Sequence, residues 1–266
     1  MIDDATIRKF GDALYSAFLA RTTIAPLIEQ CDILEIEECY RIASHFVKRR
    51  VQAGEAVVGK KIGVTSKPVQ DALGVFQPDF GQLTSGMAHT NNAVLDLNKL
   101  IQPKAEAELA FVLKSDLIGP GITAVDVISA TDYVTPCFEI VDSRINDWKI
   151  GIKDTIGDNA SCGVFALGDV KGDPRSLDLT LSGMVIEKNG ELFATATGAA
   201  VQGSPANAVA WLANTLGKLG MPLRAGEIIL SGSQGPLIQV VDGDHLKCEI
   251  GGLGVCEISF SGRSAV

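Results

Sequence analysis

The chain has 266 residues, of which 46% are hydrophobic, 21% are charged and only 6% are aromatic. This balance is typical of a soluble globular protein and excludes an intrinsically disordered chain. The net charge is −9, from 23 basic and 32 acidic side chains, and without a basic cluster we expect no nucleic-acid or membrane partner. The acidic start, MIDDATIRKF, lacks the apolar core of an export signal, and no apolar run is long enough to cross a bilayer. We therefore expect a cytoplasmic protein with reduced cysteines.

Two amphipathic helices are predicted at the N-terminus. Apolar side chains recur every three or four residues over 5–20 and again over 35–53, where Gly54 ends the second pattern. We expect these helices to form a small N-terminal subdomain, residues 1–55.

The next segment changes character. Residues 57–65 are predicted to form a strand that contains Lys60 and Lys61. A short helix should follow over 66–74, with proline in its first turn and glycine at its end. The QPDFG sequence, which contains Asp79, is expected to be a loop because it is rich in turn-forming residues.

Further elements are predicted along the rest of the chain. They are strands over 106–113 and 137–142, a helix that starts at Thr123 and ends near Pro136, a hairpin at Asn189-Gly190, a helix from Ser204 to Gly220 with Leu219 facing inward, and short strands over 228–260. Together they predict an α+β protein in which the helical unit packs on a larger, mostly antiparallel β-rich domain, residues 56–266.

Three glutamates are candidate metal ligands. Glu106 and Glu108 lie two apart in a predicted strand, so both carboxylates should face the same side, where a cation would remove their repulsion. The alternative is an ordinary solvated strand face. Glu139 lies among apolar residues in CFEIV, where burial requires a partner. It could complete an all-oxygen set, which selects Mg²⁺ or Mn²⁺ over zinc, or it could form an ion pair with Arg144.

Other polar residues have both a functional and a structural interpretation. Strand alternation should turn one of Lys60 and Lys61 inward, where a lysine can balance an anion or carry a proton, although both could be solvated. Asp79 and Ser161 could serve chemistry or merely form turns or caps. Ser233 follows an apolar strand and could meet a substrate carboxylate, or lie in a plain turn.

The histidines argue against two other kinds of site. His45 lies in a helical pattern, and His89 and His245 lie in predicted polar turns. Such scattered positions give little support to a histidine zinc site or a Ser-His triad.

Several long blocks carry a resemblance to a known family. They are GKKIGVTSKPVQDALGVFQPDFGQLT, IQPKAEAELAFVLKSDLIGPG, CFEIVDSRINDWK, DNASCG and GSPANAVAWLANTLG. In this order they resemble the 2-hydroxypenta-2,4-dienoate hydratases, enzymes of aromatic meta-cleavage catabolism within the fumarylacetoacetate hydrolase superfamily. The related 4-oxalocrotonate decarboxylases share the lysine strand and the glutamates, but QPDFG and CFEIVDSRINDWK are more similar to the hydratases.

The resemblance implies a fold, an activity and a set of site residues. The fold is the superfamily's β-rich roll, and the reaction is metal-dependent hydration of 2-hydroxypenta-2,4-dienoate (2-oxopent-4-enoate) to 4-hydroxy-2-oxopentanoate. The alternatives are the decarboxylase itself or a non-catalytic partner subunit of that enzyme. The family's pattern also implies a homo-oligomer and a possible complex with the decarboxylase. The residues implied are Glu106, Glu108 and Glu139 for Mg²⁺ or Mn²⁺, Lys61, Asp79 and Ser161 for catalysis, and Ser233 for the substrate.

Overall fold

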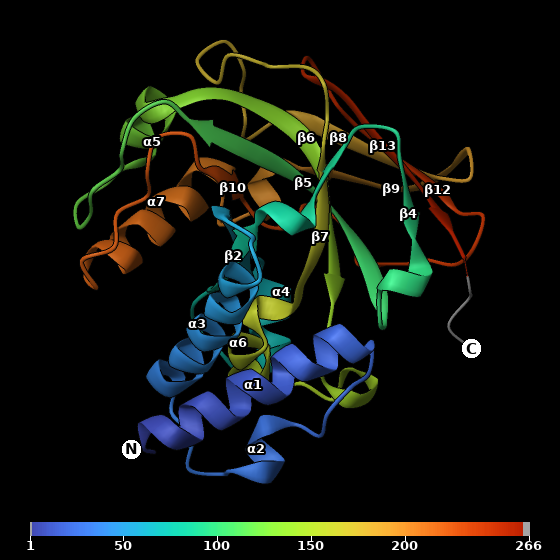
Figure 1. Ribbon diagram of the computed structural model, residues 1–266. Coiled ribbons are helices and arrows are strands. Elements are labelled where there is room, and N and C mark those ends of the chain that lie inside the picture. Colours follow the sequence, from blue (N-terminus) through green and yellow to red (C-terminus); the bar gives the residue numbers. More distant parts are fainter. Residues whose placement is uncertain (1, 263–266) are drawn as a thin grey trace.

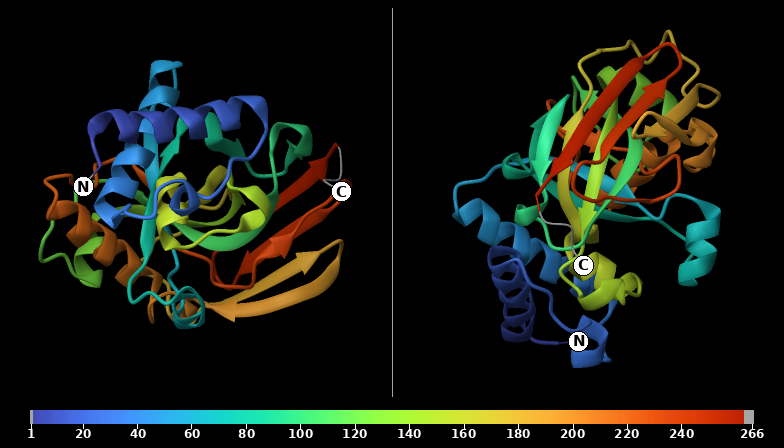
Figure 2. Two further views of the ribbon diagram at one scale, coloured as in Figure 1. Left: turned by 90° about the horizontal axis from the view of Figure 1, so that it is seen from below. Right: turned by 90° about the vertical axis from the view of Figure 1, so that its right-hand side faces the viewer.

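The computed structural model describes residues 2–262 and begins with helices (Figure 1). These are α1 (Asp4–Ala20), α2 (Leu27–Gln30) and α3 (Ile36–Gln52); α1 and α3 are close to the predicted ranges, and α2 was not predicted. The Asp3 side chain caps α1 by accepting a hydrogen bond from the Thr6 N–H. Apolar faces of α1 and α3 meet in a separate small core that also takes in Ile145 and Ile156 from the β-rich part. Figure 1 and the right-hand view of Figure 2 show these helices at one end of the sheets. The subdomain boundary at residue 55 stays a prediction.

The rest of the chain is mainly β-structure with short helices. In chain order the elements are β1 (Val57–Gly63), α4 (Lys67–Leu73), β2 (Asp79–Thr84), η1 (Ser85–Met87), β3 (Ala88–Thr90), β4 (Ala93–Asp96), η2 (Leu97–Lys99), β5 (Pro103–Leu113), α5 (Ala124–Ala130), β6 (Thr131–Asp142), η3 (Asn146–Trp148), α6 (Ile152–Gly157), η4 (Asn159–Ser161), β7 (Cys162–Leu167), β8 (Gly183–Lys188), β9 (Glu191–Thr197), η5 (Gly198–Ala200), α7 (Pro205–Gly217), β10 (Ile228–Leu230), β11 (Ile238–Gln239), β12 (His245–Ile250) and β13 (Gly254–Ser261).

The strands form two mixed sheets. The larger has the order β2-β1-β10-β5-β6-β7-β3, with β11 added beside β5, and the smaller has the order β4-β13-β12-β8-β9. Most neighbours are antiparallel; β1 with β10, β3 with β7, and β4 with β13 are parallel. The prediction of an α+β fold with a mostly antiparallel β-rich part is confirmed.

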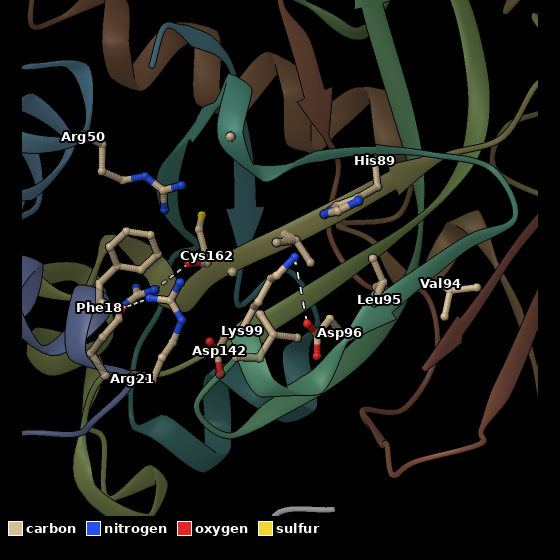
Figure 3. Close-up of a pocket in the computed structure, with 15 residues that line it drawn as sticks. Phe18, Arg21, Arg50, His89, Val94, Leu95, Asp96, Lys99, Asp142 and Cys162 are labelled. Atoms are coloured by element: carbon tan, nitrogen blue, oxygen red, sulfur yellow. Dashed lines mark hydrogen bonds and ion pairs between the residues drawn. The ribbon is translucent and has the colours of Figure 1, made fainter. Parts of the chain in front are cut away.

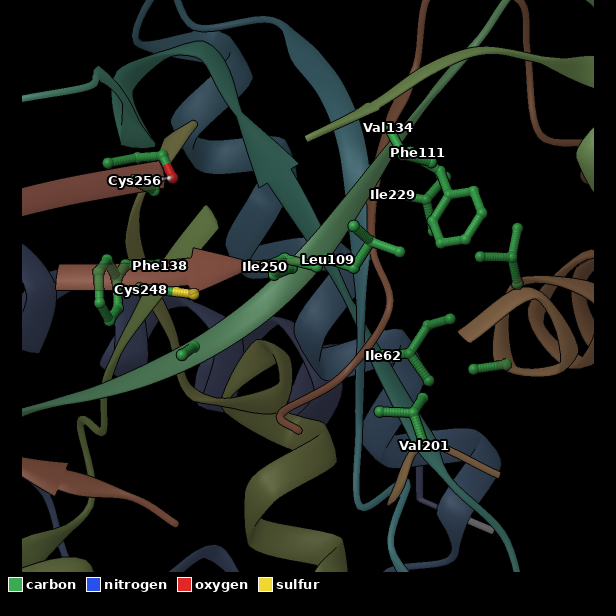
Figure 4. Close-up of a cluster of buried hydrophobic side chains, with 14 of the residues drawn as sticks. Ile62, Leu109, Phe111, Val134, Phe138, Val201, Ile229, Cys248, Ile250 and Cys256 are labelled. Atoms are coloured by element: carbon green, nitrogen blue, oxygen red, sulfur yellow. Dashed lines mark hydrogen bonds between the residues drawn. The ribbon is translucent and has the colours of Figure 1, made fainter. Parts of the chain in front are cut away.

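The main core lies between these sheets and α7 (Figure 4). Because strand side chains alternate, Ala107, Leu109 and Phe111 of β5 all face this core and are at most 2% exposed. The intervening Glu106 and Glu108 therefore point away from the apolar core. The fold thus presents the carboxylates on the opposite face of the same strand.

Several local predictions are wrong. The helix that begins after Thr123 ends at Ala130, because the β-branched residues that follow it join β6, and Pro136 lies inside that strand. Leu219 lies beyond the end of α7 and is 60% exposed, so it does not face inward. His89 and His245 are in strands β3 and β12 rather than turns.

Asp79 is also not in a loop. It is the first residue of β2 and is paired with Gly63 of β1, which buries it. Throughout residues 2–262, no helix combines the length and apolar character needed to cross a membrane.

Candidate metal centre and active site

The pairing of β5 with β6 brings the three glutamates together. Glu106 and Glu139 are direct partners in the antiparallel register, and Glu108 lies two residues along on the same face. One carboxylate oxygen from each lies within 4.8 Å of the others. Glu108 and Glu139 are at most 1% exposed and Glu106 is half-buried, so this is not an ordinary solvated strand face.

Lys61 is the cation beside this cluster. Its Nζ lies 3.1 Å from Glu139 Oε1, and both side chains are buried. Lys60 points elsewhere and bonds to Glu227. The predicted alternation of the two lysines is therefore present, and the solvated alternative is wrong because both lysines are buried. Glu139 pairs with Lys61 and not with Arg144, so the alternative ion pair is also wrong.

The electrostatics of the cluster follow from burial. Loss of water raises the pKa of Glu106 and of Glu108, and it raises the pKa of Glu139 to about 7 although the attraction of Lys61 offsets part of the effect. Burial also acts against the charge of Lys61, but Glu139 and the other nearby acids outweigh it, so the pKa of this lysine is raised. The site therefore contains a stable ammonium ion and carboxyl groups that resist ionisation without a further cation.

The oxygen atoms of the cluster suit a hard dication. Glu108 Oε2 accepts a hydrogen bond of 2.7 Å from the Gly232 N–H. Within residues 2–262, Glu108 Oε1 and Glu139 Oε2 have no hydrogen-bond partner although both are buried. Buried, unpaired carboxylate oxygens are costly, and a cation such as Mg²⁺ or Mn²⁺ would satisfy them. The residues present thus fit an all-oxygen metal site.

Asp79 lies next to Lys61 across a glycine. A Cβ atom on Gly63 would lie 2.3 Å from Asp79 Oδ1 and 3.6 Å from Lys61 Nζ, so only glycine leaves room for the carboxylate there. Neither Asp79 oxygen has a hydrogen-bond partner in the described part of the chain. Burial raises the pKa of Asp79, and attraction to Lys61 opposes this effect. The carboxylate is therefore a buried group with free acceptor positions.

Ser161 lies in a left-handed turn that packs on β2. Its Oγ is buried and has no partner among the residues described. The φ angles of Asn159, Ala160 and Ser161 are 53°, 52° and 53°, a region that costs about 1–2 kcal/mol for each residue other than glycine. The turn lies close to Gly81, the partner of Lys61 in the β1–β2 ladder: a Cβ atom there would lie 2.4 Å from Asn159 O.

Ser233 lies in the loop after β10 and is half-buried. Its Oγ donates a hydrogen bond of 2.9 Å to the Gly235 carbonyl. The preceding residue, Gly232, holds Glu108 through its N–H. The structure therefore places Lys61 against the glutamate cluster, Asp79 next to Lys61, Ser161 in the turn packed on β2, and Ser233 one residue after the glycine that bonds to Glu108.

Two features were missed by the sequence reasoning. Tyr40 of α3 stacks on Phe80 of β2, with ring centroids 4.3 Å apart, and burial together with the charge of Asp79 raises the pKa of its phenol. Tyr40 thus brings α3 next to the strand that carries Asp79, and the 3–4 apolar periodicity of residues 35–53 gives no hint of this. The second feature is the ion pair of Arg144 with Asp158, both buried, which links the segment after β6 to the turn that carries Ser161.

A separate cavity of about 300 Å³ lies beside β7 and opens between the N-terminal helices and the β3–β4 region. Figure 3 shows Phe18, Arg21 and Arg50 on one side and His89 and Lys99 on the other. None of the predicted site residues lines it.

Comparison with known proteins places the chain in a family. Residues 57–260 match the family model described as fumarylacetoacetate (FAA) hydrolase C-terminal. The chain belongs to the fumarylacetoacetate hydrolase family. It is 53% identical to 2-hydroxyhexa-2,4-dienoate hydratase from Comamonas testosteroni, over 98% of this chain and all of the relative. It is 54% identical to 2-hydroxypent-2,4-dienoate hydratase from Pseudomonas putida, over 83% of this chain and all of that relative.

A solved structure of a family member shows the same fold. The structure of 4-oxalocrotonate decarboxylase from Pseudomonas putida G7, complexed with magnesium and adipate, matches with a TM-score of 0.95 and 33% identity, over 98% of this chain and 99% of that one. The predicted family membership and the roll-type fold are confirmed, and the protein is an enzyme of the hydratase group.

Proposed function

We propose that this family member hydrates 2-hydroxypenta-2,4-dienoate to 4-hydroxy-2-oxopentanoate and that it requires a divalent metal. The observation that carries the proposal is the cluster of Glu106, Glu108 and Glu139, of which the last two are buried, with Lys61 beside it. Relatives at 53–54% identity are named dienoate hydratases, and the cluster gives this chain the groups that such a reaction needs.

The proposed metal is Mg²⁺ or Mn²⁺, held by the three glutamates. The all-oxygen ligand set favours these ions, and the similar decarboxylase structures were obtained with magnesium and with calcium. When bound, the ion would polarise the C2 oxygen of the substrate and orient its carboxylate. Gly232 keeps Glu108 in place for this role.

The protein's own groups have distinct proposed tasks. Lys61, charged and buried, holds the proton that stabilises the enolate oxygen or returns to carbon. Asp79 offers free carboxylate oxygens that can orient a water molecule, and the Ser161 hydroxyl can donate a hydrogen bond to it. Ser233 lies at the Glu108 side, where its hydroxyl can meet the substrate carboxylate.

The order of steps follows from the chemistry of a dienol. The enol gives up its O–H proton and C5 gains one, which leaves a C3=C4 double bond conjugated with the C2 ketone. Water then adds its oxygen to C4, with Asp79 accepting or orienting its proton. A proton added at C3 completes the 4-hydroxy-2-oxo acid, so that the overall change is addition of one water molecule. Lys61 and Asp79 are themselves shielded from bulk water because both are buried.

The competing function is decarboxylation of a 2-oxo-hexenedioate. The match to 4-oxalocrotonate decarboxylase at a TM-score of 0.95 favours it as the second candidate. The same carboxylates and lysine could stabilise the enolate that loss of carbon dioxide leaves. We further propose that the chain forms a homo-oligomer and can associate with a decarboxylase of this kind; a non-catalytic partner subunit would then lack dienoate turnover of its own.

The decisive experiment follows the ultraviolet absorbance of 2-hydroxypenta-2,4-dienoate with purified protein, with and without a chelator, and identifies the product. We expect loss of absorbance, formation of the 4-hydroxy-2-oxo acid and no carbon dioxide. Glu106→Gln should lower kcat by more than the roughly 10–100-fold typical of losing an outer partner of a metal site. Glu227→Gln is the matched control, since Glu227 bonds to Lys60 away from the cluster. Wild-type turnover by Glu106→Gln would refute the metal assignment, and release of carbon dioxide would favour the decarboxylase.

A further inference from the structure

We propose that Arg144 is a positioning residue for the reaction: it holds the left-handed turn Asn159–Ser161 in place and so directs the Ser161 hydroxyl into the active site. The inference rests on the proposed function in one respect, which is that Ser161 takes part in the chemistry. Neither the metal cluster nor the substrate contacts require Arg144.

The guanidinium of Arg144 donates hydrogen bonds to the residues on both sides of the turn. Its Nε and Nη2 donate to the carboxylate and the carbonyl of Asp158, which precedes the turn, and its Nη1 donates to the Cys162 carbonyl, which follows it, at 2.6 Å. The Asp158 carboxylate also accepts hydrogen bonds from the Arg144 backbone N–H at 2.9 Å and from the Ser143 hydroxyl at 3.1 Å. Arg144 is 1% exposed and Asp158 is fully buried.

The turn needs such a constraint because its backbone is unfavourable. Asparagine tolerates a left-handed φ, but Ala160 and Ser161 do not favour it. Strained backbone of this kind persists where several surrounding contacts hold it in place, and it occurs at functional sites. On the other side, Asn159 bonds through its side chain to both the N–H and the carbonyl of Gln82 in β2, at 2.8 and 3.0 Å. The turn is thus fixed between Arg144 and the strand next to Lys61.

The geometry connects this clamp to the proposed chemistry. Gly81 is the ladder partner of Lys61, and a Cβ atom at Gly81 would lie 2.4 Å from Asn159 O and 2.7 Å from Cys162 Sγ. The turn therefore lies directly against β2, at the position that pairs with Lys61 of β1. A relaxation of residues 159–161 to right-handed backbone would move the Ser161 Oγ, which now lies buried without a partner in the described chain.

An arginine is required because the three groups that it bonds to, the Asp158 carboxylate and the Asp158 and Cys162 carbonyls, lie in different directions. A planar guanidinium reaches a carboxylate and two carbonyl groups at once, whereas a lysine ammonium is a compact point charge on a flexible stem. The Phe46 ring of α3 lies 5.0 Å from the Arg144 guanidinium and packs against it. Arg144 also borders the cavity beside β7, so a shorter side chain would leave room for the turn to relax.

The test is a double-mutant cycle with Arg144→Lys and Ser161→Ala. Arg144→Lys should lower kcat on the dienoate by about 10–100-fold, the range expected when a reacting group is misplaced by about 1 Å, with a smaller change in KM. In the Ser161→Ala background the same substitution should cost less than about 3-fold, because the group that it positions is already gone. Arg50→Lys is the matched control: Arg50 is also buried and ion-paired, with Glu55, and none of the hydrogen bonds of the described residues joins its side chain to residues 158–162. It should leave kcat within about 3-fold of wild type.

Equal fold-losses for Arg144→Lys in both backgrounds would show a purely structural role and would overturn the inference. If Arg144→Lys does not fold, Asp158→Asn replaces it, since it weakens the same clamp with little change in volume, and the same non-additivity is expected. A crystal structure of the folded variant supplies a readout independent of activity: residues 160 and 161 should leave the left-handed region, and retention of the wild-type turn would refute the proposal. Lack of dienoate hydration by the wild-type protein would instead refute the proposed function and leave the structural readout to decide on Arg144.

Discussion

Removal of the proposed metal should make the stability of the protein depend on pH through Glu139. In the metal-free protein, burial raises the pKa of this carboxyl from 4.5 to about 7, against the attraction of Lys61. Between these two pH values the unfolded chain gives up the proton and the folded chain keeps it. The unfolded state therefore binds fewer protons, and the free energy of unfolding falls as the pH rises through this window. At about 1.4 kcal/mol per pH unit, the interval corresponds to roughly 3 kcal/mol.

The measurement is urea unfolding of chelator-treated protein at pH 5 and pH 8. Wild type should lose roughly 3 kcal/mol more stability between these pH values than Glu139→Gln, in which the titrating group is gone. The other acids of the cluster are present in both proteins, and Glu139 also raises the pKa of Glu108, so the difference reports on Glu139 together with its coupling to the cluster. Glu227→Gln, whose glutamate bonds to Lys60, should keep the wild-type pH dependence.

Added Mg²⁺ provides the second arm of this experiment. At a concentration of about 100 times its Kd, a bound ion adds about 2.7 kcal/mol to the stability. We expect this gain for wild type at pH 8 and a smaller gain at pH 5, because the proton on Glu139 competes with the ion. Identical pH dependence in wild type and Glu139→Gln would refute the reasoning, as would equal stabilisation by Mg²⁺ at both pH values.

Three further predictions follow from the packing. Lys61→Met should lower kcat by at least about 100-fold, whereas Lys60→Met should change it little; steady-state kinetics showing the reverse would overturn the orientation of the two lysines. Gly63→Ala should abolish most activity because the new Cβ atom would lie 2.3 Å from the buried Asp79 carboxylate. Gly183→Ala is the control in the same assay and should behave as wild type, since no atom lies within 4 Å of the added Cβ atom. Phe111→Ala should destabilise the protein by roughly 3–5 kcal/mol because this ring is fully buried in the main core. The Mg²⁺ affinity measured by calorimetry should not change. An unchanged urea midpoint would contradict the core assignment.

Features that depend on local periodicity were predictable from the sequence. The two N-terminal helices follow from a 3–4 spacing of apolar residues. The shared face of Glu106 and Glu108 follows from strand alternation alone. The predicted 189–190 hairpin occurs between β8 and β9, because Asn189 and Gly190 both adopt the positive φ angles that this turn requires. The resemblance added the family and the remaining site residues.

Local pattern failed where neighbours in space override it. The helix expected to reach Pro136 ends at Ala130, because the residues after it pair along β5. Asp79, in a sequence rich in turn formers, instead begins a strand because it pairs with Gly63 of β1. Strand pairing supplies backbone hydrogen bonds that outweigh such weak local preferences.

The sequence by itself determined which residues could carry chemistry, and the tertiary structure decided how they are partnered. Glu139 could have paired with Arg144 or with a lysine, and only the register of β5 with β6 and the place of β1 assign it to Lys61. Arg144 is left to hold the turn before Cys162. The physical reason is that a side chain's partner depends on backbone hydrogen bonds between strands far apart in the chain, whose register no local spacing encodes.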